Sequence, residues 1–292
     1  MKLAHLPILL GLKRPKPRLY EQSTVVVDLA QDGPIDFAVW HHPNERASFP
    51  SQPEIDELRT FIRPGDFCID IGAQTGDTAV PIALACGPTG ACLALEPNPY
   101  CFPVLEANAR LNRSRLNIIP LRYAVGEREE TMTFNYSDPG YCNGGVMPDI
   151  ARWRHGHLFP LDVEARRLES VLAGYGDRAE RLRYIKIDAE GGEYHILRGG
   201  FVTIQKFRPV VSFEFGANAI ENYGICCEQM GEYWLSRRYI LSDIQGHLLQ
   251  TPEEFAASAY AQNVWDYIAV PMESTPVIKR IASILPVFLE FV

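Results

Sequence analysis

A turn of small and polar residues follows a short apolar run near residue 70, in the stretch CIDIGAQTGDT. Such a turn lets backbone N–H groups approach a nucleotide-like ligand closely. It contains only Gly72 and Gly76, whereas the dinucleotide-binding motif has three glycines. Glu96 follows 20 residues after Gly76, at the end of the next apolar run, where a carboxylate can accept hydrogen bonds from both ribose hydroxyls. The two features together predict an adenosine-type ligand, although the turn alone is also what a plain strand–helix connection would need.

The side chains in this turn favour S-adenosylmethionine over a nicotinamide dinucleotide. Gln74 and Thr75 stand where the second glycine of a pyrophosphate-binding turn would lie. S-adenosylmethionine has no phosphate, and its amino-acid end needs polar partners such as Asp70 and the backbone of the turn. The residues expected to bind this cofactor are Asp70, Gly72, Ala73, Gln74, Thr75, Gly76, Glu96, Pro97 and Asn98.

A second group of charged residues lies in the stretch YIKIDAEGGE. Lys186, Asp188 and Glu190 occupy alternate positions, so they share one side of a strand. A carboxylate at the strand end can accept a proton from a hydroxyl acceptor or orient that hydroxyl. We therefore predict Asp188 as the first catalytic candidate and Glu190 as the second. Three alternatives stay open: Glu190 caps the next helix, Lys186 forms a structural ion pair, or the carboxylates hold magnesium.

The acceptor is expected to contact a polar, glycine-bearing stretch from about 130 to 160, because long loops in compact domains often bind ligands. Its aromatic and amide side chains suit a sugar-like molecule. The acceptor-side candidates are Tyr141, Asn143, Trp153, His155, His157 and Glu214. His195, in the helix after the second group, is expected to pack rather than to react.

The elements that position these residues alternate between strand-like and helical patterns from residue 67 onward, and the stretch LNIIPLRYAVG is expected to be one strand of this series. Such alternation predicts a mostly parallel sheet with helices on both faces, an α/β fold. No helical run is expected between the last two strands, YILSDI and WDYIAVP, which are therefore predicted to pair antiparallel. STVVVDLAQDGPIDFAVW predicts a β-hairpin before the sheet, and a short helix follows it.

Composition limits the possible partners and the compartment. The net charge of −8 argues against nucleic acid as the main partner. Seven cysteines without a C-x-x-C pair predict a reduced, cytoplasmic protein, and no metal-ligand cluster is evident. The first 20 residues lack a small-residue cleavage site and are interpreted as a docking arm. No apolar run is long enough to span a membrane.

Five stretches, in this order, resemble the FkbM family of methyltransferases. They are FCIDIGAQTGDTAV, LALEPNPYCFPVLEANARLN, YAVGEREETMTF, YIKIDAEGGEYHILRGG and VVSFEFG, and the similarity covers about residues 60 to 271. KIDAEGGE is the most specific part, with Ala189 in place of the family's usual valine and Gly192 in place of a common alanine. Gln74 stands where the family usually has asparagine, which is also a polar amide.

The resemblance implies a Rossmann-like class I methyltransferase fold, a seven-stranded sheet with an antiparallel last strand. It also implies methyl transfer from S-adenosylmethionine to an oxygen, often a hydroxyl of a sugar or polyketide. Glu96 would bind the ribose, and Ala124 and Val125 would lie by the adenine. A nicotinamide-dependent oxidoreductase and an inactive interaction module on the same fold are the alternative functions.

The chain is expected to have three parts. Residues 1–60 would form an arm, a hairpin and a short helix, 61–272 the methyltransferase domain, and 273–292 an apolar tail. Apolar residues recur in the tail at steps of three and four, which predicts a helix. This helix is expected to pack on its own domain, to pair with a second subunit in a homodimer, or to lie on a membrane surface. The membrane is the least favoured of the three, because only Lys279 and Arg280 would support it.

Overall fold

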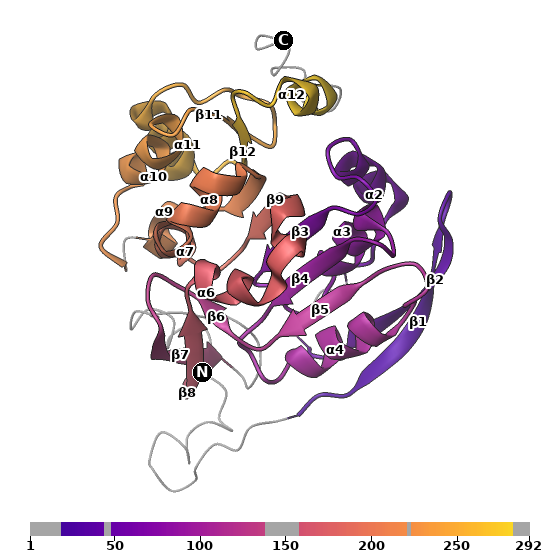
Figure 1. The fold of residues 1–292 in the computed structure, drawn as a ribbon. Helices are drawn as coiled ribbons and strands as arrows, with labels where there is room; N and C mark the ends of the chain where they lie inside the picture. The colour runs from indigo at the N-terminus through magenta and orange to yellow at the C-terminus, as the bar shows by residue number, and fades with distance from the viewer. Residues whose placement is uncertain (1–18, 44–47, 138–157, 221–222, 283–292) are drawn as a thin grey trace, which may run out of the picture.

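The structure is a computed structural model, and it describes residues 19–43, 48–137, 158–220 and 223–282. A seven-stranded sheet lies at its centre, in the order β11-β12-β10-β9-β3-β4-β5 (Figure 1). Its strands are β3 (Phe67–Ile71), β4 (Ala91–Leu95), β5 (Ile118–Leu121), β9 (Leu182–Ile187), β10 (Val210–Glu214), β11 (Tyr239–Asp243) and β12 (Asp266–Pro271). β10, β9, β3, β4 and β5 run parallel, and β12 is antiparallel to both of its neighbours. The predicted fold class, with its antiparallel last strand, is therefore confirmed.

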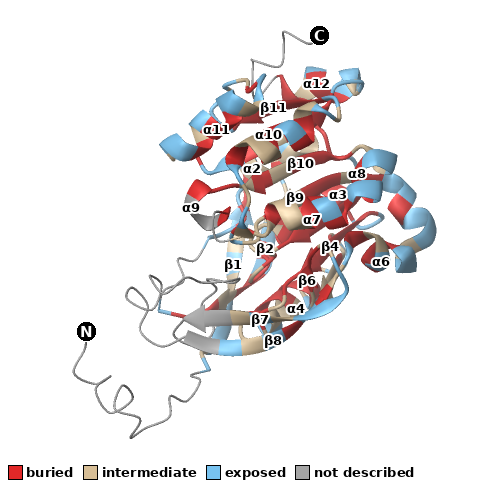
Figure 2. Cartoon of the chain, turned by 90° about the vertical axis from the view of Figure 1, so that its left-hand side faces the viewer, coloured by how far each residue is buried: buried red, intermediate tan, exposed pale blue. Residues whose placement is uncertain are grey.

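Helices cover both faces of this sheet, which explains why its central strands are mostly apolar (Figure 2). All five residues of β3 and of β4 are buried. The helices packed on one face are α6 (Leu168–Leu172), α7 (Glu193–Gly199), α8 (Phe201–Phe207), α9 (Ala217–Ile220), α10 (Cys227–Leu235) and α11 (Pro252–Ala261). Those on the other face are α2 (Gln52–Arg59), α3 (Ala79–Cys86), α4 (Phe102–Arg110) and α12 (Thr275–Ile281). A 3₁₀ helix, Ala173–Arg181, leads from α6 into β9.

The predicted hairpin is present as β1 (Gln22–Leu29) and β2 (Gly33–Trp40). Asn108 of α4 and Asn112, in the turn after this helix, bind the outer edge of β2. The Asn108 side chain accepts a hydrogen bond from Ala38 N and donates to Ala38 O, and Asn112 bonds the backbone of Asp36 in the same way. Asn108 Nδ2 also donates to Thr75 O at 2.8 Å, so one side chain links the hairpin to the glycine turn. The hairpin thus shares its packing with the large domain across the expected boundary at residue 60.

A second, smaller sheet stands beside the first and has the order β6-β8-β7. β6 (Ala124–Val125) pairs parallel with β8 (Leu158–Arg166), which pairs antiparallel with β7 (Glu130–Ser137). The stretch LNIIPLRYAVG was expected to be one strand, but it divides into β5 and β6 in two different sheets. The stretch from about 130 to 160 was expected to be loop-like, yet both of its ends are strands, and only 138–157 lies outside the described residues.

The connection between β11 and β12 corrects another expectation. Residues from Thr251 onward were expected to form a loop, but α11 lies there. Thr251 accepts a hydrogen bond from Glu254 N, and the Glu254 side chain accepts one from Thr251 N, which is a capping box. The helix buries Phe255, Ala256 and Ala259 against α10 and the sheet.

The described part of the tail packs on its own domain. α12 buries Val277, Ile278 and Ile281 in the same core as α3 and the hairpin. The rest of the tail, 283–292, lies outside the described residues. None of the helices in the described ranges is long and apolar enough to cross a membrane.

Candidate active site

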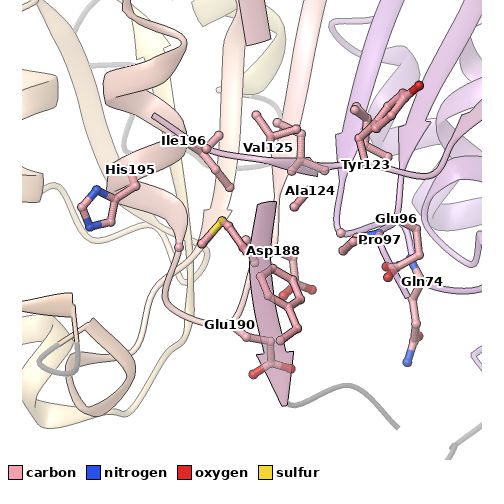
Figure 3. A pocket seen from close by; sticks show the side chains of 18 of the residues that line it. Gln74, Glu96, Pro97, Tyr123, Ala124, Val125, Asp188, Glu190, His195 and Ile196 are labelled. Carbon is pink, nitrogen blue, oxygen red and sulfur yellow. The ribbon is translucent and has the colours of Figure 1, made fainter. Parts of the chain in front are cut away.

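A cavity of about 770 Å³ opens at the carboxyl ends of β3, β4 and β9, next to β6 and β7. Ligands bind at this edge of parallel sheets because the strand ends, the following turns and the helix N-termini converge there. Figure 3 shows Gln74, Glu96 and Pro97 on one side of the cavity, Asp188 and Glu190 in the middle, and His195 and Ile196 on the other side. The two sequence motifs, separated by more than 100 residues, therefore meet at one cavity.

The glycine turn and the end of β9 are in direct backbone contact. Asp188 N donates to Ile71 O at 2.9 Å, and Gly72 N donates to Leu95 O at 2.9 Å. Gly72 has φ +82°, and a Cβ built on it would overlap the carbonyl oxygen of Asp188. Only glycine fits there, because a side chain would both strain the backbone and displace the strand end that carries Asp188.

Glu96 is buried (3% exposed), and its side chain connects the turn after β3 with the turn after β4. Its Oε1 accepts a hydrogen bond from Asn98 N at 2.7 Å, and its Oε2 accepts one from Gln74 N at 2.9 Å. Burial raises the pKa of this carboxyl group to about 7, although the two backbone donors oppose that shift. Each carboxylate oxygen can accept a further hydrogen bond, so Glu96 retains capacity for the hydroxyls of a ligand.

Lys186 is held between two aspartates beneath the cavity. Its Nζ lies 3.1 Å from Asp188 Oδ2 and 3.7 Å from Asp70 Oδ1. Burial disfavours the ammonium, but the charges of the two carboxylates outweigh it and raise the pKa of Lys186. Asp70 has no exposed surface, and Thr78 Oγ1 donates to its Oδ2 at 2.6 Å. The structural ion pair considered for Lys186 is therefore present, and Asp70 lies behind the cavity wall.

Asp188 and Glu214 share a hydrogen bond and have opposite pKa shifts. Burial and the hydrogen bond to Asp188 raise the pKa of Glu214 to about 9. Burial works against ionisation of Asp188 too, but Lys186 and the hydrogen bond from Glu214 lower its pKa. At neutral pH Glu214 is the protonated donor and Asp188 the ionised acceptor.

Glu190 points into the cavity from the turn after β9. It has φ +52°, a strained conformation for a residue with a side chain. Glu190 is exposed to solvent, but the cavity walls around its carboxyl group, and then the charge of Asp188, raise its pKa to about 7. The next helix, α7, begins at Glu193, has Gly192 at its N-cap and has no side-chain cap, so Glu190 does not cap it. Glu193 instead holds the preceding turn, because its Oε1 accepts hydrogen bonds from Ala189 N and Gly191 N at 2.8 and 3.2 Å.

The far side of the cavity is formed by β6, β7 and α7. Met132 and Phe134 of β7 give it an apolar wall. His195 lines the cavity, and its Nδ1 lies 3.2 Å from Glu127 Oε2. Arg198 Nη2 lies 2.9 Å from the other oxygen of Glu127, so this carboxylate has two basic partners.

The predicted residues divide into three groups. Those that line the cavity are Gly72, Gln74, Glu96, Pro97, Ala124, Val125, Asp188 and Glu190. Those close to it but outside its lining are Asp70, Ala73, Thr75, Gly76, Asn98 and Glu214. Tyr141, Asn143, Trp153, His155 and His157 lie outside the described residues.

Several lining residues were not singled out from the sequence. They include Asp77, Tyr123, Glu127, Met132, Phe134, Tyr223 and Asp266. Asp77 lay within the quoted motif and could have been found there. Asp266 was hidden from sequence reasoning, because it reaches the site only through its antiparallel pairing with Glu214. In the described part of the chain, no group of three or more His, Cys, Asp or Glu side chains is placed to hold a metal ion.

The chain is similar to several known proteins. The methyltransferase sdnD of Sordaria araneosa is 27% identical over 155 residues, which are 46% of this chain and 60% of that protein. Among solved structures, a methyltransferase FkbM from Methylobacillus flagellatus is 16% identical with a TM-score of 0.40, and the match covers 75% of this chain and 51% of that one. An S-adenosylmethionine-dependent O-methyltransferase from Thermotoga maritima is 9% identical with a TM-score of 0.39, over 85% and 77% of the two chains. Scores this low bear on neither activity nor substrate.

The chain spans less than two thirds of sdnD and about half of the Methylobacillus protein. The family comparison covers more of it. The model of the methyltransferase FkbM domain matches residues 70–241, from the first cavity residues through β11, which is more than half of the 292 residues. The chain belongs to the FkbM methyltransferase family.

Proposed function

We propose that the protein is an S-adenosylmethionine-dependent O-methyltransferase acting on a hydroxyl of a sugar, a glycan or a natural product. The observation that carries this proposal is the charge of the cavity. Seven carboxyl side chains line it: Asp77, Glu96, Glu127, Glu130, Asp188, Glu190 and Asp266. Only Arg128 and Lys186 oppose them as permanent cations in the described lining. Such a cavity suits a cationic sulfonium ligand and disfavours the pyrophosphate of a nicotinamide dinucleotide.

The residues that line the cavity would fit successive parts of the cofactor, in the order of the strands that carry them. Glu96, at the end of β4, would hold the ribose, and Ala124 and Val125 of β6 would lie by the adenine. The turn at Gly72, at the end of the neighbouring β3, lines the cavity next to Glu96. When bound, S-adenosylmethionine supplies a methyl group that an oxygen can accept. The acceptor would then lie on the β9 side, where Asp188, Glu190 and Asp266 line the cavity.

The pKa values favour different roles for the two catalytic candidates, Asp188 and Glu190. A base that works near neutral pH needs a pKa close to 7, which is where the cavity walls and the charge of Asp188 place Glu190. Asp188 has a lowered pKa and is already bound by Lys186 and Glu214, so it is a weak base. We therefore assign proton acceptance from the acceptor hydroxyl to Glu190. Asp188 would orient that hydroxyl, which reverses the ranking expected from the sequence.

The acceptor surface would include β7 and the segment that follows it. Glu130, Met132 and Phe134 project from β7 into the cavity. The segment with Tyr141, Asn143 and Trp153 continues directly from this strand in the sequence. An apolar wall beside carboxylates fits a neutral, hydroxyl-bearing molecule with an apolar face, and it disfavours nucleic acid.

A labelled-methyl screen would test the activity. The protein is incubated with S-adenosylmethionine carrying a labelled methyl group and with glycans, lipids and natural-product extracts. Label transferred to a hydroxyl that is then located by mass spectrometry supports the proposal. Cofactor binding without transfer to any acceptor class would favour the alternative of an inactive interaction module.

Other expectations remain proposals. A homodimer through the tail would be seen by light scattering as a doubled mass, compared with a chain that ends at Ser274. The burial of α12 supports packing on its own domain first. A cytoplasmic location still rests on the cysteines alone.

A further inference from the structure

Asp77 is an acidic residue of the cavity without an assigned role. It directly follows Gly76, at the point where the turn after β3 enters α3, and it lines the cavity. Its carboxylate accepts hydrogen bonds from its own N–H and from that of Thr78. The side chain is thereby fixed in place with its charge facing the cavity.

Most of the charged groups near Asp77 are acidic. Its titratable neighbours are Lys186, Asp188, Asp70 and Glu54, and three of these four are acidic. Lys186 already contacts Asp70 and Asp188. In the described ranges, no ion pair joins Asp77 to a basic side chain. Burial beside these carboxylates raises its pKa, so a ligand cation placed here would stabilise the ionised form.

The order of the strands indicates which part of the cofactor reaches this position. In the proposed function, Glu96 on β4 takes the ribose, and the adenine lies on the side of β6. The turn after β3 lies on the opposite side of Glu96, because β4 stands between β3 and β5 in the sheet and β6 follows β5 in the chain. The part of S-adenosylmethionine beyond the ribose on that side is its amino-acid end.

We infer that Asp77, rather than Asp70, binds the α-ammonium group of S-adenosylmethionine. Asp70 was the residue expected to do so, but it is fully buried and does not line the cavity; Thr78 donates to its Oδ2, and its Oδ1 faces Lys186 at 3.7 Å. A charge-assisted hydrogen bond between a carboxylate and an ammonium group is among the stronger polar contacts available to a ligand. This inference rests on the proposed function.

Three ligands and three variants separate this role from a structural one. Calorimetric titrations would use S-adenosylmethionine, S-adenosylhomocysteine and 5′-methylthioadenosine, which keeps the adenosine but has no amino-acid end. The variants are Asp77→Asn, Glu96→Gln and Asp36→Asn. Asp36 lies on β2 and does not line the cavity, so its variant controls for the loss of one negative charge.

Asp77→Asn is expected to weaken the first two ligands about tenfold and to leave 5′-methylthioadenosine within about twofold of wild type. Unchanged binding of 5′-methylthioadenosine also shows that the variant is folded. Glu96→Gln is expected to weaken all three ligands, and Asp36→Asn none. If Asp77→Asn weakens none of them, or all three equally, the inference is wrong. A wild-type protein that binds none of the three would instead overturn the proposed function.

Discussion

At the scale of single residues, four glutamates near the cavity are predicted to hold protons differently because their partners differ. Glu96 and Glu193 accept backbone hydrogen bonds, Glu214 bonds to Asp188, and Glu190 faces the cavity. Desolvation of the carboxyl group raises the pKa of all four, to about 7 or to about 9. Since these values lie near neutral pH, ligand binding and turnover should both change between pH 6 and 8.

The affinity for S-adenosylmethionine should fall as the pH falls below about 7. Ribose hydroxyls donate to the ionised form of Glu96, and protonation of a group with a pKa of about 7 removes that acceptor. Titrations from pH 5.5 to 8.5 on the wild type and on Glu96→Gln would isolate this group from the other carboxylates. The variant should bind about 10–100-fold more weakly at pH 8, by about 1–3 kcal/mol, and vary less with pH. Equal pH dependence in both proteins would exclude Glu96 as the cause.

Turnover should depend on Glu190 more than on any other carboxylate. With an acceptor from the labelled-methyl screen, Glu190→Gln should lower kcat by about 10²–10⁴-fold, because it removes a general base. The rise of wild-type kcat through pH 7 should disappear with it. Asp188→Asn should also lower turnover more than cofactor affinity, but it should keep that rise. Full turnover by Glu190→Gln would show that another group accepts the proton.

At the scale of elements, the turn after β3 is built for one residue type. Gly72→Ala would place a methyl group onto the carbonyl oxygen of Asp188 and strain a backbone with φ +82°. We expect a loss of about 3 kcal/mol or more in the free energy of unfolding, measured by urea denaturation. Gly174→Ala is the matched control, because nothing lies within 4 Å of its Cβ position. Similar stability for both variants would contradict the close contact between the turn and β9.

Much of this element order could be predicted from the sequence, and the exceptions have physical reasons. The alternating pattern predicted the central sheet because β4 is apolar throughout and β3 is apolar except for Asp70. It missed α11, although the Thr251–Glu254 pair is a capping-box signal, because the small residues of this helix give little apolar periodicity. It joined β5 to β6 because a change of sheet between Leu121 and Ala124 leaves no mark in local hydropathy.

The site was predictable as a pair of motifs but not in its roles. Alternation predicted that Asp188 and Glu190 share one side of a strand, but β9 ends at Ile187 and both residues lie in the turn after it, where they line the cavity. The choice between Asp70 and Asp77 depends on which carboxylate the strand buries, and the sequence does not record that. The contact of Asp266 with the cavity likewise depends on pairing between distant strands.

At the scale of the whole molecule, the raised pKa values make stability depend on pH. Between about 4.5 and 7 the folded state keeps protons on Glu54, Glu96 and Glu193 that the unfolded chain has lost. Stability must therefore fall as the pH rises through this window. We expect a lower Tm at pH 7.5 than at pH 5 for the protein without ligand. Glu193→Gln should reduce the difference, and a Tm that rises over this range would contradict the burial of these groups.

A cationic ligand bound in the cavity would offset the free-energy cost of keeping its carboxylates ionised, which links the pKa values of single residues to the stability of the whole molecule. The central claim is that S-adenosylmethionine is this ligand, and calorimetric titration at pH 8 with S-adenosylmethionine and with NAD tests it most directly. We predict one S-adenosylmethionine bound per chain, about 10–100-fold weaker binding by Glu96→Gln, and no heat from NAD. Binding of NAD that depends on Glu96, with none of S-adenosylmethionine, would contradict the account.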